Sequence, residues 1–222
     1  MKKLSVLMAV SAIALAGITS MAGATLSFDL GIGNPAIAGY PGPYANVKVT
    51  LLDATTAQIE FQSLTNSGNI YLMGDGGSIA VNVNATTWGL LTGTGGNVGT
   101  GFTPGPYSDG GAGNEDGFGS FNQTVDTFDG FTHSSSSRVI RVYNTSGTWA
   151  TDNDVLIANA QGHRAAAHIF VTAYTGGVNA ANGALGTGFA TEGETTVPEP
   201  TSMLLLGLGL VGAGAARRRK KS

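Results

Sequence analysis

Hydrophobic and polar residues alternate along the middle of the chain, so that every second side chain is apolar in several short stretches. The alternation is clearest in residues 46–51, 57–62 and 79–84. A period of two places the apolar side chains on one face of a β-strand and the polar side chains on the other. These stretches therefore predict strands with one face on a core and the other face in water.

Short turn signals separate these strands and predict how they connect. Asp, Asn, Ser and Gly gather at residues 53–56, 66–69 and 74–77, and these residue types favour tight turns. Residues 70–73 form a further apolar run between the second and third of these turns. Residues 45–84 are therefore predicted to form a four-stranded antiparallel meander.

The second half of the chain is less regular. Residues 92–116 are rich in Gly and carry two prolines, so we expect a long loop there, of the kind that is either functional or poorly ordered. Strand pattern returns at residues 118–121, 138–143, 154–158 and 186–190. It is strongest in residues 165–174, whose nearly continuous apolar run predicts a central strand buried on both faces.

Together these patterns predict an all-β domain without helices. About eight to ten short strands with Gly, Asn and Asp turns are typical of a two-sheet antiparallel sandwich or jelly roll. Residues 25–190 are long enough for one domain with a full-size core. The chain has no cysteine, which excludes a disulfide framework, so the domain must be held together by its core or by bound ions.

Residues 1–24 have the three parts of a secretory signal peptide. Lys2 and Lys3 provide the positive start, residues 4–17 the apolar segment, and the small residues at 22–24 the cleavage site. We therefore expect export through the Sec translocon and cleavage by signal peptidase after Ala24. An uncleaved N-terminal membrane anchor is the alternative.

The other end combines a proline pair, an apolar run and a basic cluster. The motif residues are Val197, Pro198, Glu199 and Pro200, and the cations are Arg217, Arg218, Arg219, Lys220 and Lys221. Residues 203–216 between them are predicted to be a transmembrane helix, with residues 217–222 as a basic tail on the cytoplasmic side. At about 1.5 Å per residue this helix is shorter than the roughly 30 Å hydrocarbon core, which suits a temporary anchor.

This order of parts resembles the PEP-CTERM sorting signal. The resemblance implies that an exosortase, a membrane protease, cleaves the chain near Pro198, Glu199 and Pro200. It also implies a precursor held transiently in the inner membrane and a product at the cell surface or in the extracellular matrix of a biofilm, where this family accompanies exopolysaccharide. Residues 25–190, notably 71–77 and 165–171, resemble PEP-CTERM ectodomains, a likeness that implies no activity, and residues 191–197 are expected to be a linker.

Charge is divided unevenly between the targeting segments and the rest of the chain. The chain has 11 Lys and Arg against 14 Asp and Glu. The region between the signal peptide and the sorting signal keeps only four cations, which are Lys48, Arg138, Arg141 and Arg164. So acidic a domain repels phosphate backbones, and we therefore expect no nucleic-acid partner.

Two groups of acidic and amide residues are candidates for a calcium site. They comprise Asp109, Asn114, Glu115 and Asp116 in the Gly-rich run, and Asp152 and Asp154 further on. Ca²⁺ takes six to eight oxygen ligands, which flexible loops can supply, although the spacing does not fit an EF-hand. The alternative is that these residues only favour turns through local hydrogen bonds. No other metal or cofactor is expected.

Histidines and aromatic residues complete the candidates for chemistry. The three histidines show no zinc-binding spacing, and we expect His163 in an exposed loop and His168 as a hydrogen-bonded core residue. Five rings would give a sugar-stacking surface if they converged, whereas buried rings would be structural. These rings belong to Tyr40, Tyr44, Trp88, Tyr107 and Trp149.

The sequence thus predicts a non-enzymatic, secreted β-sandwich that an exosortase sorts, and that serves as a structural component of the extracellular matrix or exopolysaccharide layer. The first alternative is a glycan- or calcium-binding module. The second is an enzyme acting on polysaccharide, which would need two carboxylates facing each other across a cleft.

Overall fold

The computed structural model describes residues 25–174 and 177–193. The predicted signal peptide, the proline motif, the predicted transmembrane helix and the basic tail lie outside these residues. The described part consists of β-strands and four short 3-10 helices, and none of its helices has the length and apolarity needed to cross a membrane. The predicted all-β sandwich is confirmed.

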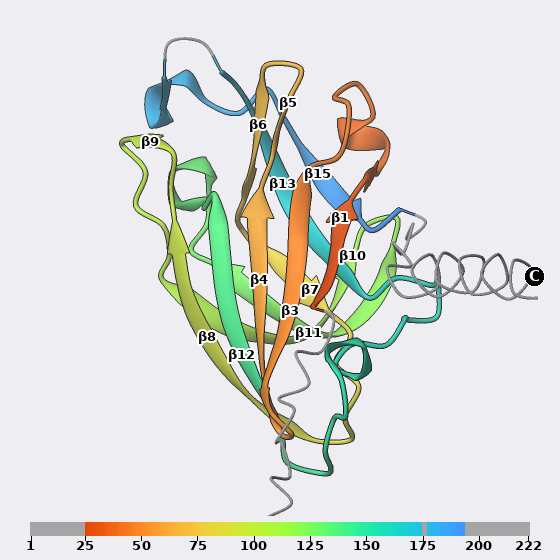
Figure 1. Ribbon diagram of the computed structural model, residues 1–222. Coiled ribbons are helices and arrows are strands. Elements are labelled where there is room, and N and C mark those ends of the chain that lie inside the picture. Colours follow the sequence, from red (N-terminus) through yellow and green to blue (C-terminus); the bar gives the residue numbers. More distant parts are fainter. Residues whose placement is uncertain (1–24, 175–176, 194–222) are drawn as a thin grey trace, which may run out of the picture.

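Five strands form the sheet that faces the viewer in Figure 1, which we call sheet A. Every pair in this sheet is antiparallel. In spatial order its strands are β1 (Leu26–Leu30), β3 (Ala45–Asp53), β4 (Thr56–Ser63), β12 (Ser137–Asn144) and β8 (Trp88–Gly96).

Eight strands form the second sheet, sheet B, which lies behind sheet A in Figure 1. Its main path is β10 (Tyr107–Glu115), β11 (Gly119–Thr127), β7 (Ile79–Val81), β13 (Ala165–Ala173), β15 (Gly186–Thr191) and β2 (Ile32–Gly33). β6 (Asn69–Met73) also pairs with β13, and β5 (Thr65–Asn66) pairs with β6. The remaining elements are β9 (Gly99–Thr100), β14 (Val178–Asn179), and the 3-10 helices η1 (Pro35–Ile37), η2 (Phe131–His133), η3 (Asp152–Asp154) and η4 (Ala180–Asn182).

The main core lies between the two sheets and is built by the alternation seen in the sequence. Sheet A contributes residues such as Val47, Val49 and Ile59, and sheet B contributes Val81 and Ile169. All five are buried, because each strand turns one of its two faces toward the opposite sheet. Hydrophobic burial on this scale is the main stabilising term for a chain without disulfides.

β13 is the central strand of sheet B and is buried on both faces, as the sequence predicts. It pairs with β6, β7 and β15. Its residues Ile169 and Val171 join the main core, whereas Ala166 and Phe170 on the other side belong to two smaller clusters. The outer face of sheet B is therefore apolar and covered at this strand.

The predicted four-stranded meander over residues 45–84 is wrong. β3 and β4 pair as expected, but β6 and β7 belong to sheet B and β4 pairs instead with β12. The turn signals give the places where the chain reverses. They do not say which strands pair, and here β6 and β7 pair along one edge of β13, whose other edge pairs with β15.

Two further strand predictions are also wrong. Residues 92–116 are not one long loop, because they contain the end of β8 and all of β10. Glycine is required inside one of these strands: Gly93 has φ +71°, and a Cβ atom there would collide with the backbone of Val139 on β12. Residues 154–158 hold the end of η3 and a single bridge between Leu156 and Val83, so the short apolar run there forms no strand.

Candidate functional site

The β10–β11 hairpin packs its tip onto the outer face of sheet B. Phe118 in the turn and Phe121 on β11 cluster with Ala80 of β7 and Ala166 of β13. The pairing of β10 with β11 shifts register twice between Asp109 and Gly113, and such shifts bend a hairpin. The bent hairpin thus covers apolar surface that the sheet would otherwise expose.

Few polar contacts hold this tip in place. Asn34 donates its side-chain amide to the backbone oxygen of Asp116 at 3.3 Å, and Asn159 donates to the backbone oxygen of Phe118 at 2.9 Å. The ring of Phe118 meets His163 edge to face, with 5.4 Å between the ring centroids.

Glu115, the last residue of β10, is buried beneath the tip with 1% of its surface exposed. Its carboxyl group lies against Gly77, whose φ of +62° suits glycine, and a Cβ atom at that position would collide with the Glu115 oxygens. Oε2 of Glu115 has no hydrogen-bond partner. Burial, and then the neighbouring carboxylate of Asp126, raises the pKa of Glu115 to about 8.

Asp126 also borders a cavity of about 470 Å³ on the same side of the molecule. Its Oδ1 accepts a hydrogen bond from the backbone N–H of Gly77 at 2.7 Å. Two more carboxylates and two aromatic rings line the cavity, from Asp75, Asp129, Tyr107 and Phe128. Asp126 therefore neighbours the buried Glu115 and also borders this cavity.

Arg138 is a second buried charge, fully enclosed on β12. Its Nη1 and Nη2 donate to the backbone oxygens of Thr94 at 3.0 Å and Thr92 at 2.9 Å, and its guanidinium lies 3.2 Å from the ring centroid of Tyr107. Burial lowers the pKa of Arg138 to about 10, and Nε has no hydrogen-bond partner. Sequence reasoning missed this residue, although it shares the inward phase of Ile140 and Val142.

The structure does not bring the first predicted calcium group together. Glu115 is buried, whereas Asp109, Asn114 and Asp116 are exposed. Oδ1 of Asp109 accepts hydrogen bonds from the backbone of Gly111 and from the side chain of Gln123, at 2.9 and 2.7 Å. Within residues 25–174 and 177–193, no three His, Cys, Asp or Glu side chains are grouped to hold a metal ion.

The second predicted calcium group has structural partners of its own. Oδ1 of the buried Asp152 accepts a hydrogen bond from the backbone N–H of Leu51 at 2.6 Å. Oδ2 of Asp154 accepts from the backbone N–H and the hydroxyl of Thr151, at 2.8 and 2.9 Å, which completes a capping box at η3. The local hydrogen bonds anticipated as the alternative are thus present.

His168 is hydrogen-bonded through both ring nitrogens, as the sequence predicts. Nδ1 lies 3.3 Å from the backbone oxygen of Gly76, and Nε2 lies 2.8 Å from the hydroxyl of Thr187. The imidazole stacks on Phe189 with 4.3 Å between ring centroids. Burial lowers the pKa of His168 below its ordinary value, so this histidine is neutral at pH 7.

Four of the five candidate sugar-stacking rings make structural contacts. Trp149 is buried and its indole N–H donates to the backbone oxygen of Asn84 at 2.8 Å. The indole N–H of Trp88 donates to Gln123 at 2.9 Å, and Tyr44 is buried against Tyr71. Tyr107 lies under Arg138.

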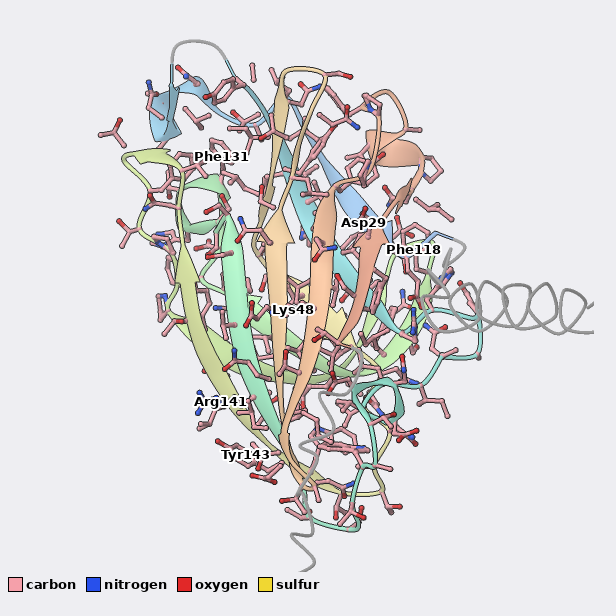
Figure 2. All side chains as sticks on the ribbon, in the orientation of Figure 1. Asp29, Lys48, Phe118, Phe131, Arg141 and Tyr143 are labelled. Carbon is pink, nitrogen blue, oxygen red and sulfur yellow. The ribbon has the colours of Figure 1, made fainter. Side chains whose placement is uncertain are left out.

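The outer face of sheet A differs from that of sheet B in being polar and open to solvent. Figure 2 shows Lys48, Arg141 and Tyr143 on this front sheet. Oε1 of Gln58 accepts a hydrogen bond from Nε of Arg141 at 3.2 Å, and the amide of Gln58 donates to Glu60 at 2.7 Å.

An ion pair fixes the end of the last strand, β15. Oε2 of Glu192 accepts from Nη2 of Arg164 at 2.7 Å and from Nε at 2.9 Å, and Oε1 accepts from the backbone N–H of Arg164 at 2.5 Å. The side chain of Glu192 is only 6% exposed. The ordered sandwich therefore extends to Glu192, through two residues that the sequence assigned to the linker.

Shortly after this ion pair the chain matches a known family model. The model of the PEP-CTERM protein-sorting motif matches residues 196–220. The match includes Val197, Pro198, Glu199, Pro200 and the cations up to Lys220, and Lys221 lies one residue beyond it. No curated protein and no solved structure matches the chain. The chain thus carries the PEP-CTERM protein-sorting motif that its sequence predicted, and the motif supports an exported protein that an exosortase sorts.

Proposed function

We propose that this protein is a non-enzymatic β-sandwich that an exosortase delivers to the cell surface, where it is a structural component of the extracellular matrix or exopolysaccharide layer. The observation that carries the proposal is the sorting motif at residues 196–220, which begins shortly after the ion pair between Arg164 and Glu192. Processing near Pro198 and Pro200 would then separate a complete domain from its temporary membrane anchor.

The ion pair between Arg164 and Glu192 supports this order of events. It ties the end of the last strand, β15, to the segment before β13. Because no disulfide holds the chain, such local anchoring matters at the point where the domain continues into the processed segment.

The sorting step can be tested by the intact mass of the surface protein, in the host and in a host without its exosortase. We expect the mature form to lack Ser222 only when the exosortase is present. Replacing the proline motif, as P198A/P200A, should leave the precursor in the inner membrane. The matched control, Thr195→Ala, changes a residue just outside the matched motif and should be processed normally. Surface protein that still carries Ser222 would overturn this part of the proposal.

The structural role can be tested separately by comparing matrix from the host with matrix from a deletion strain. We expect less retained exopolysaccharide and a softer matrix without the protein, and restoration by the processed form. Release of reducing ends from the host polysaccharide by the purified mature protein would instead favour an enzyme.

A glycan-binding module is the second candidate, and the outer face of sheet A favours it. Gln58, Glu60 and Arg141 form a hydrogen-bonded row on this face, with hydroxyl and amide side chains beside them. Such rows can bind the hydroxyl groups of a sugar chain. A glycan-array screen of the mature protein, repeated with Arg141→Ala, tests this candidate. If the variant binds the same glycans as the wild-type protein, the glycan does not bind at this row.

A further inference from the structure

The carboxyl group of Glu115 is buried in a place where an acid is unusual. It is 1% exposed, Oε2 has no hydrogen-bond partner, and it lies against the backbone at Gly77. A neutral carboxyl tolerates such a place, whereas a carboxylate without donors in a dry site is costly. The site thus holds Glu115 in its protonated form.

The charges around Glu115 reinforce this preference. Asp126 of β11 is the carboxylate that acts on Glu115. Asp75 lies two residues before Gly77 in the sequence, and Asp116 directly follows Glu115. Two histidines lie near this part of the sheet: Nδ1 of His168, whose pKa is lowered by burial, is 3.3 Å from the backbone oxygen of Gly76, and His163 touches Phe118.

The four Lys and Arg residues of the described region lie elsewhere and do not pair with Glu115. Arg138 is enclosed on β12 of sheet A, and Arg164 is paired with Glu192. Lys48 and Arg141 lie on the outer face of sheet A (Figure 2). Ionised Glu115 would therefore face Asp126 without a compensating cation among the described residues that contact it.

The hairpin that carries Glu115 is built to open locally. β10 is an edge strand that pairs only with β11, and it has two register shifts on the way to Glu115. The tip itself, residues 115–119, is held by the Phe118 cluster and by the side-chain amides of Asn34 and Asn159. Further along β11, Asn122 is hydrogen-bonded to Asn82 and Val83, so this part of the hairpin stays on sheet B. We propose that the β10–β11 hairpin is a pH-sensitive latch: with Glu115 protonated its tip lies on sheet B, and loss of that proton lifts the tip and uncovers the apolar surface beneath Phe118.

The direction of the pH dependence follows from the two states of the latch. Closed, Glu115 has a pKa of about 8, and in the lifted hairpin it returns toward the ordinary value of 4.5. Between these values the closed state binds more protons, so rising pH favours the lifted state by up to about tenfold per pH unit. Above pH 8 both states are ionised and the effect levels off.

Amide hydrogen exchange on the mature protein, from pH 5.5 to 9 and corrected for the intrinsic pH dependence of exchange, tests the latch. The reporting amides are Phe118, bonded to the backbone oxygen of Glu115, and Gly77, bonded to Asp126. We expect their protection to fall about tenfold per pH unit up to pH 8. The amide of Ile59 in sheet A should show no such fall.

Variants assign the effect to one proton. Glu115→Gln, which keeps the shape of the neutral carboxyl, should abolish the pH dependence at Phe118. The matched control Glu60→Gln, on the polar face of sheet A, should retain it. Asp126→Asn should keep the fall but end it at lower pH, because the repulsion that raises the pKa of Glu115 is removed. This variant also serves as the second test if Glu115→Gln folds poorly.

Three results would overturn the latch. The pH dependence could persist in Glu115→Gln. It could appear equally at Ile59, which would mean unfolding of the whole domain. It could vanish when millimolar Ca²⁺ is added to the wild-type protein, which would mean that a metal ion and not a proton neutralises the Glu115 and Asp126 pair.

Discussion

The two outer faces of this sandwich are both built by alternating side chains, but one face is exposed to water and the other is covered. On sheet A the outward side chains, such as Lys48, Glu60 and Arg141, are polar and meet water. On sheet B the outward positions include Ala80, Ala166 and Phe170, and the β10–β11 hairpin and neighbouring loops cover them. Strand geometry alone fixes which residues face outward, whereas the connections decide what those residues meet.

This difference bears on where function can reside. The open face of sheet A presents polar side chains to water, which is what the proposed contact with matrix polysaccharide would require. The covered face of sheet B holds a buried acid and a hairpin with few anchors, so it is the part of the molecule that can change conformation.

Removing apolar volume should distinguish the two faces most strongly. Phe121→Ala on β11 of the hairpin should lower the free energy of unfolding by about 3–5 kcal/mol, because the ring is 1% exposed and its removal leaves a cavity. Tyr143 is half-buried on the open face of sheet A, and Tyr143→Ala should lower the free energy of unfolding by less than about 1.5 kcal/mol. Urea denaturation of both variants gives the two values, and equal losses would contradict the contrast between the faces.

A pair of glycine substitutions should show how firmly the buried Glu115 side chain is held in place. Gly77 and Gly68 both have positive φ, so alanine strains the backbone by about 1–2 kcal/mol at either position. At Gly77 the new methyl group must also displace the Glu115 carboxyl, whereas Gly68 has open space around it. We therefore expect Gly77→Ala to cost about 3 kcal/mol in urea denaturation and Gly68→Ala about 1. Equal losses of stability in the two variants would mean that the Glu115 side chain moves aside without an energetic cost.

The sequence predicts much of this fold, because alternation is a local property. It identifies the strands around Val49, Ile59 and Ile140, and it identifies β13 as buried on both faces. It fails on the assignment of strands to sheets, since the pairing of β4 with β12 and of β6 with β13 joins segments far apart in the chain. It also fails on β10, whose five-residue stretch Gly110 to Asn114 has three glycines and no large side chain to signal a strand.

The candidate site is predicted less well than the fold. Glu115 is named by the sequence as a calcium ligand with Asp109 and Asp116, but the strand turns Glu115 inward and leaves the other two exposed. Its true neighbour, Asp126, comes from the next strand and from outside the predicted group. The sorting motif, in contrast, is read from consecutive residues and needs no tertiary structure to be recognised.

The stability of the covered face should depend on pH through one residue, Glu115. Glu115→Gln should raise the free energy of unfolding by about 4 kcal/mol at pH 8 and by less than about 1 kcal/mol at pH 5. The reason is that the wild-type protein pays for keeping Glu115 protonated only when the unfolded chain is ionised, between the ordinary pKa of 4.5 and the folded pKa of about 8. Denaturation curves at the two pH values check this, and a gain independent of pH would show that packing, not the proton, is responsible.

The smallest effect is expected on the open face. Arg141→Ala removes a hydrogen bond of 3.2 Å between exposed or half-buried side chains, from Nε to Gln58. Exposed polar pairs contribute little because water replaces them and side-chain entropy opposes them. We therefore expect a change within about 0.5 kcal/mol in urea denaturation, the same from pH 5 to pH 8. A loss above about 1.5 kcal/mol would mean that the row of Gln58, Glu60 and Arg141 stabilises the sandwich, and sheet A would then be less free to use that row for binding than its exposure indicates.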